Sequence, residues 1–93
     1  MANQCNVIVL EETKLSRPDG WALCFQWCRY VHSDKTIEYG YRFIWRWPNG
    51  NLQAARGQAR LPSVELMERL IAKARHEGWA DKDSGDVADS FAG

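Results

Sequence analysis

Cys24, Cys28 and His32 are the residues of this 93-residue chain whose types and spacing are most suggestive of metal binding. On a helix, a spacing of four would place the three side chains on one face. The intervening segment FQWCRYV is rich in aromatic and β-branched residues and favours a strand instead. Strand neighbours four apart are separated by roughly 13 Å, whereas zinc ligands lie about 2.0–2.3 Å from one ion. We therefore predict no metal site and no cofactor.

Neither histidine of the chain is placed for nucleophilic catalysis. A catalytic serine or cysteine needs a histidine that a third group orients. His32 only neighbours Ser33 and Asp34 in a polar loop, and His76 falls on the outer side of an expected helix. The sequence therefore predicts no catalytic residues and a protein that is not an enzyme. The alternative is an enzyme whose site forms only across a dimer.

Composition indicates one small globular domain. Hydrophobic residues make up 45% of the chain and include five Trp, which is too much apolar surface for a disordered protein. Three cysteines, an odd number, do not form a disulfide framework, so a reducing cytoplasmic location is expected. The longest apolar run, Val7 to Leu10, is too short to span a membrane.

Charge is unevenly distributed although the net charge is zero. Residues 1–79 carry eleven Lys or Arg against eight Asp or Glu, and residues 80–93 carry one Lys against four Asp. We expect residues 1–79 to form the single α+β domain and residues 80–93 to be a flexible acidic C-terminal tail. A mildly cationic body permits anionic partners without requiring them.

The elements that position these residues are predicted from a period of two between Ile37 and Trp47. Large apolar side chains occupy the odd positions, which is typical of a strand with one buried face. Pro18-Asp19-Gly20 and Pro48-Asn49-Gly50 each predict a three-residue hairpin loop with a glycine bulge. A polar loop at residues 32–36 joins the middle pair. The expected strands cover residues 5–14, 22–31, 37–47 and 51–60.

A helix is predicted from about residue 63 to 77. Ser63 is a suitable N-cap, and Gly78 a suitable C-terminal cap with Trp79 placed for the accompanying apolar contact. The apolar stripe of the helix is expected to cover the odd-numbered face of the sheet. The stripe contains Val64, Leu66, Met67, Leu70, Ile71 and Ala74. The predicted fold is therefore α+β, a four-stranded antiparallel meander sheet with one C-terminal helix packed on one face.

The even-numbered face of this sheet is left without an intrachain cover. It is expected to show Ile8, Leu10, Cys24, Gln26, Cys28, Tyr30, Arg42, Ile44, Arg46, Leu52, Arg56 and Arg60. Apolar surface beside arginines is typical of an interface. We predict a binding module for protein-protein interaction or homodimerisation, and the alternative is a weak single-stranded nucleic-acid-binding protein. The predicted contact residues are Arg42, Ile44, Arg46, Leu52, Arg56 and Arg60.

Overall fold

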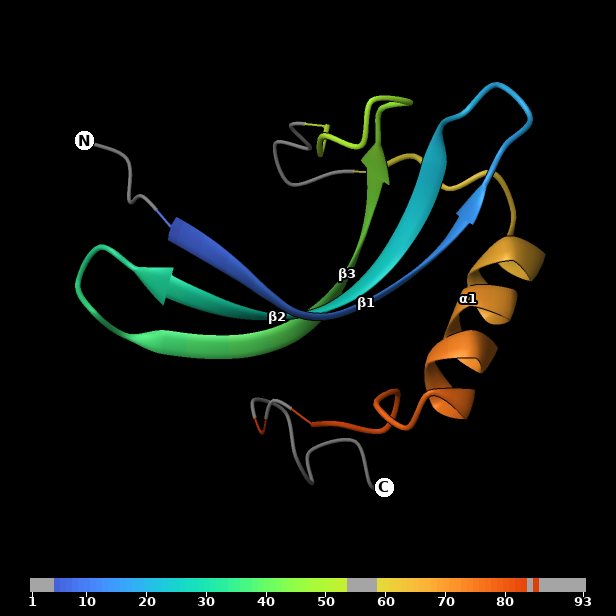
Figure 1. Ribbon diagram of the computed structural model, residues 1–93. Helices are drawn as coiled ribbons and strands as arrows, with labels where there is room; N and C mark the ends of the chain where they lie inside the picture. The colour runs from blue at the N-terminus through green and yellow to red at the C-terminus, as the bar shows by residue number, and fades with distance from the viewer. Residues whose placement is uncertain (1–4, 54–58, 84, 86–93) are drawn as a thin grey trace.

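The computed structural model describes residues 5–53, 59–83 and 85 and has an α+β fold. Strands β1 (Cys5–Ser16), β2 (Ala22–His32) and β3 (Ile37–Arg46) form an antiparallel sheet in that order. Helix α1 (Val64–His76) lies on one side of this curved sheet, against β1 and β2 (Figure 1). Within the described ranges, no helix is long and apolar enough to cross a membrane.

The fourth predicted strand, residues 51–60, is not confirmed. Leu52 forms a single bridge to Arg46, and the Gln53 N–H donates to the carbonyl of Trp45 at 2.8 Å. Residues 54–58 lie outside the described residues, and Ala59 and Arg60 are not in a strand. The sheet therefore has three strands over the part of the chain that the structure describes.

The three hairpin loops share one geometry. In each, the residue before the loop donates its N–H to the carbonyl of the residue after the loop, four positions later. These pairs are Arg17–Trp21, His32–Thr36 and Trp47–Asn51. The last loop residue is left-handed in each, with φ of 95° at Gly20, 71° at Lys35 and 92° at Gly50. The two glycine loops were predicted. The middle loop places a lysine where glycine is preferred.

We expect Lys35→Gly to raise the free energy of unfolding by about 0.5–1 kcal/mol. A Cβ atom strains a left-handed residue, and removing that strain outweighs the greater freedom that glycine has in the unfolded chain. Urea denaturation measures the change. Lys35→Ala keeps the Cβ atom and serves as the control, since it should give no comparable gain.

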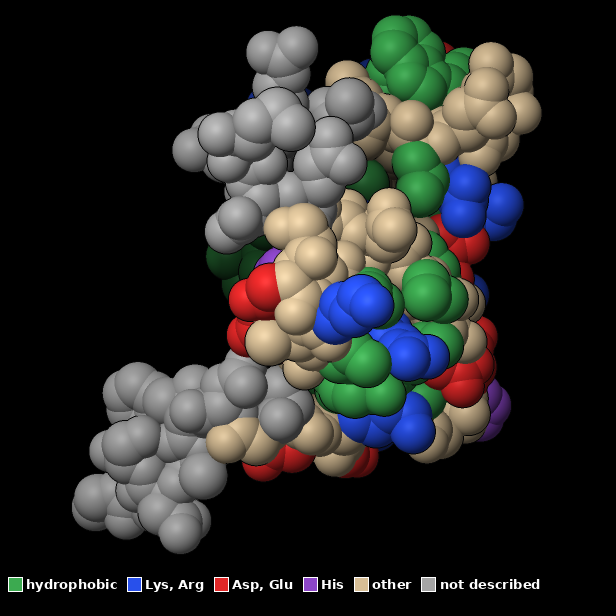
Figure 2. Space-filling view, turned by 90° about the vertical axis from the view of Figure 1, so that its left-hand side faces the viewer, with side chains coloured by type: hydrophobic (Ala, Val, Ile, Leu, Met, Phe, Trp, Pro, Cys, Tyr) green, Lys and Arg blue, Asp and Glu red, His purple; other side chains and the backbone are tan. Residues whose placement is uncertain are grey.

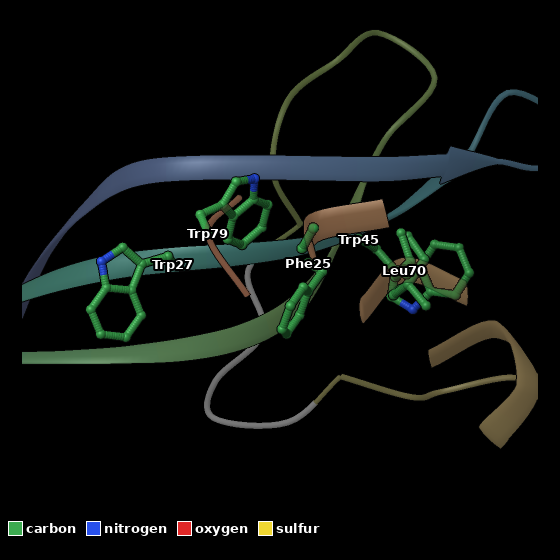
Figure 3. Packing of buried hydrophobic residues seen from close by; sticks show 7 residues of the cluster. Phe25, Trp27, Trp45, Leu70 and Trp79 are labelled. Atoms are coloured by element: carbon green, nitrogen blue, oxygen red, sulfur yellow. The ribbon is translucent and has the colours of Figure 1, made fainter. Parts of the chain in front are cut away.

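The register of β2 and β3 is the one that the alternating pattern predicts. Leu23 pairs with Trp45, Phe25 with Phe43 and Trp27 with Tyr41. Their side chains lie beneath α1 and the residues that follow it. Figure 3 shows Leu70 of α1 beside Trp45, and Trp79 beside Phe25. The main core consists of Leu23, Phe25, Trp27, Trp45, Leu70, Ala74 and Trp79, each at most 7% exposed.

The first part of β1 corrects the predicted faces. A β-bulge shifts the register between Val9 and Glu11, so that Val9 pairs with Cys28 and Ile8 with Arg29. An inserted residue reverses the facing of every side chain on one side of it. Val7 and Val9, predicted on the helix-covered face, therefore lie on the opposite face. Ile8, predicted on that opposite face, instead lies on the same side as α1.

Helix α1 begins and ends as predicted. The Ser63 Oγ accepts from the Leu66 N–H at 3.1 Å, and Gly78 follows the helix with φ of 92°. The Trp79 N–H donates to the carbonyl of Ala74 at 3.1 Å, which seats the buried Trp79 ring against the sheet. Val64 departs from the prediction because it is 65% exposed and does not join the buried stripe.

Candidate functional site

The face of the sheet opposite α1 has a row of polar residues at its centre. Glu12 of β1, Gln26 of β2 and Arg42 of β3 are direct cross-strand partners. Arg46, four residues after Arg42, points to the same face because side chains alternate along a strand. We call this surface the Arg-bearing face and define it by Glu12, Lys14, Gln26, Tyr30, Arg42 and Arg46.

Gln26 holds the row together. Its Nε2 donates to the Glu12 Oε2 at 2.5 Å, and its Oε1 accepts from the Arg42 Nε at 2.7 Å. The residue is 0% exposed although it lies on the face of the sheet opposite α1. A buried amide is stable when both its donor and its acceptor are satisfied. Gln26 therefore fixes the position of the Arg42 guanidinium relative to the sheet.

Arg46 forms the second connection to Glu12. Its Nε and Nη2 donate to the Glu12 Oε2 at 3.0 and 2.9 Å, and its Nη1 donates to the Gly50 carbonyl at 2.6 Å. The ion pair joins the two outer strands across β2. It crosses the row in which Cys24 pairs with Ile44, and both of these residues are buried, with exposures of 0% and 4%.

The electrostatics of the ion pair favour its charged form. Partial burial by itself raises the pKa of Glu12, but the hydrogen bonds from Gln26 and Arg46 outweigh it and hold that pKa below its usual value of 4.5. Burial by itself lowers the pKa of Arg46, but the hydrogen bonds and charge of Glu12 outweigh this effect and raise the Arg46 pKa. The network is therefore fully ionised at neutral pH.

The cysteines are not arranged for chemistry. Cys24 and Cys28 are buried in β2, and burial raises the pKa of Cys24 to about 11 and also raises that of Cys28. Cys5 is an exposed free thiol on β1. His32, predicted in the polar loop, is instead the last residue of β2, and its Nε2 is 2.6 Å from Glu38 Oε1. Among the described residues, no three His, Cys, Asp or Glu side chains gather closely enough to hold a metal ion.

The predicted contact residues do not all occupy the Arg-bearing face. Arg42 and Arg46 do, and Leu52, 37% exposed, lies next to Arg46 through its bridge. Ile44 faces the same way but is buried, so it is not the open apolar contact that was predicted. The carbonyl of Arg60 accepts from the Trp45 indole at 2.8 Å, which places its backbone on the side of α1 instead. Arg56 lies outside the described residues.

Glu12 is the important residue of this face that the sequence reasoning did not identify. The signal in the sequence is its register: when β1 is aligned with β2, the Glu12 carboxylate lies in one row with Gln26 and Arg42. Comparison with protein-family models, curated proteins and solved structures finds no match to this chain.

Proposed function

We propose that this protein is a non-enzymatic binding module that docks a protein partner through the Arg-bearing face. The observation that carries the proposal is the setting of Arg42. Its Nε is held by Gln26, whereas its two terminal nitrogens meet no hydrogen-bond partner among the described residues. A guanidinium fixed on one side presents two parallel donors on the other, which suits a carboxylate.

The neighbours of Arg42 support recognition of a protein surface. Tyr30 is half-buried on the same face, and Leu52 is 37% exposed beside Arg46. Side chains that are already ordered lose little entropy on binding. Apolar contact at Leu52 and Tyr30 would contribute burial, and the arginines would orient carboxylates of the partner.

The experiment compares the proteins that wild-type and Arg42→Gln chains retain from a cell extract, followed by measured affinities for each purified protein. A partner of the Arg-bearing face should bind Arg42→Gln at least about tenfold more weakly, because a charge-assisted contact is lost. Arg69→Gln, on the exposed side of α1, is the matched control and should bind as the wild type does. Equal affinities for all three chains would contradict the proposal.

The alternative proposal is binding of single-stranded nucleic acid by the same face. Lys14, Arg42 and Arg46 are cationic there, and the carboxylates of Glu12 and Glu38 lie on the same face. Against it, Phe25 and Trp45 are buried under α1 and are not offered for base stacking. An oligonucleotide titration at two salt concentrations decides the question. Affinity that falls steeply with salt supports this alternative, and no binding at low salt excludes it.

A further inference from the structure

The two edge strands of the sheet are unequally protected against addition of another strand. β1 has a bulge after Val9 and carries Glu11, Glu12 and Lys14 along its middle. Bulges and charged side chains are the usual means by which proteins block an edge. β3 pairs with β2 without any register shift from Ile37 to Arg46 and contains no proline. Among the described residues, the part of the β3 edge from residue 37 to 43 is therefore the open one, because Leu52 and Gln53 lie against Arg46 and Trp45.

The outward backbone groups of β3 belong to its odd-numbered residues. The His32 N–H donates to the Thr36 carbonyl, so these two residues are a hydrogen-bonded pair of the β2–β3 ladder. Hydrogen-bonded and non-hydrogen-bonded pairs alternate along an antiparallel ladder. Even-numbered residues of β3 thus bond to β2. Trp45 agrees with this, since its carbonyl faces outward and accepts from Gln53. In residues 37–43 the outward groups have no backbone partner within the described chain.

We propose that β3 pairs antiparallel with β3 of a second copy, about a two-fold axis at Gly40, to form one continuous sheet. The outward N–H and C=O groups of the two β3 strands can bond only if odd-numbered residues of one copy lie opposite odd-numbered residues of the other. Near the middle of the strand, this condition is met by a two-fold axis at Tyr39, Gly40 or Tyr41. An axis at Gly40 sets Glu38 opposite Arg42 of the second copy, and the symmetry repeats the pair. Axes at Tyr39 and Tyr41 set Arg42 opposite Thr36 and Gly40 respectively, so charge complementarity selects Gly40.

The other face of the joined strands would be covered as well. In this register Tyr39 lies opposite Tyr41 and Ile37 opposite Phe43 of the second copy. Tyr39 is 41% and Ile37 45% exposed in the single chain. Figure 2 views the molecule from the side of the β2–β3 loop, where hydrophobic side chains lie among those of Lys and Arg. Apolar cross-strand pairs of this kind stabilise a sheet.

Gly40 gives independent support for the position of the axis. A Cβ atom built there would meet only the Tyr30 ring, at an ordinary 3.8 Å, so the described chain does not require glycine at this position. Glycine inside a strand otherwise weakens it and often marks close approach of another backbone. At the axis the two Gly40 residues form a non-hydrogen-bonded pair, the closer type, with Cα atoms about 4.5 Å apart.

The inference concerns the β3 edge and shares the Arg42 guanidinium with the proposed function, so its first test leaves Arg42 unchanged. Its first test is Gly40→Cys in a Cys5→Ser background, where the other two thiols are buried. The two new thiols would face each other within disulfide range. We expect a disulfide-linked dimer under mild oxidation. The control is Tyr39→Cys in the same background, whose thiols would face each other only in the neighbouring register, and the Gly40→Cys dimer should form at least about tenfold faster. Equal rates, or no linked dimer, would overturn the proposal.

A second test uses charge and needs no new thiol. Glu38→Arg and Arg42→Glu each place like charges opposite one another, so each variant alone should dimerise more weakly than the wild type in sedimentation experiments. An equimolar mixture of the two restores both opposite-charge pairs and should form heterodimers. Circular dichroism establishes that each variant is folded. Folded variants that fail to complement each other would refute the Gly40 register.

Discussion

Leu70→Ala is expected to lower the free energy of unfolding by about 3 kcal/mol, within the range of 2–5 kcal/mol typical of buried leucines. Leu70 is 0% exposed and is the largest fully buried side chain of α1, packed in the main core. Truncation removes buried methyl groups and leaves a cavity that the stacked aromatic rings cannot close, because rigid rings relax little. Urea denaturation followed by tryptophan fluorescence measures the change.

Val64→Ala is the matched control for this prediction. Val64 lies on the same helix but is 65% exposed, so its truncation should change stability by no more than about 0.5 kcal/mol. Similar effects of the two substitutions would mean that α1 does not cover the sheet with the face described above.

Glu12→Gln is expected to cost about 1–2 kcal/mol at neutral pH. The substitution keeps the size of the side chain and an oxygen for Gln26, but it removes the charge that Arg46 contacts. Charge-assisted hydrogen bonds contribute more than neutral ones, and partial exposure of this pair reduces the difference. Denaturation of both proteins in urea at pH 7 gives the value.

The effect of Glu12→Gln depends on pH in a defined direction. The folded-state pKa of Glu12 lies below its ordinary value of 4.5, so the wild type gains stability from this carboxylate above that pH and loses it as the pH falls through the folded-state pKa. The difference between wild type and variant should therefore shrink below about pH 4.5. Glu11→Gln, exposed on the opposite face of the same strand, is the control and should show little difference at any pH. A difference for Glu12→Gln that persists at low pH would contradict the ion pair.

Much of the fold follows from local chemistry in the sequence. The alternation from Ile37 to Trp47 and the polar loop at residues 32–36 determine the register of β2 and β3, and Pro18-Asp19-Gly20 determines where β1 turns into β2. The Ser63 cap, the apolar stripe and Gly78 determine the ends of α1. These signals are strong because a shift of one residue would expose the aromatic side chains.

The remaining features depend on packing between distant segments. The bulge between Val9 and Glu11 contains neither glycine nor proline. The local sequence therefore does not indicate that the side chains of β1 switch faces at this point. The ion pair across the sheet is made by an arginine that reaches a carboxylate on the far strand, and such long side chains can extend in several directions. Alternation predicted which face carries the arginines. It did not predict the ion pair between Glu12 and Arg46 or the burial of Ile44.

The most direct test of the Arg-bearing face is nuclear magnetic resonance of the arginine Nε–H groups while a glutamate-rich peptide is added. The account predicts that the Arg42 signal shifts most, because its terminal nitrogens are available beside a fixed Nε. Arg17 and Arg75, whose guanidinium groups already pair with neighbouring aspartates in exposed positions, should shift less. An Arg42 signal that moves no more than those two would contradict recognition of carboxylates by this face.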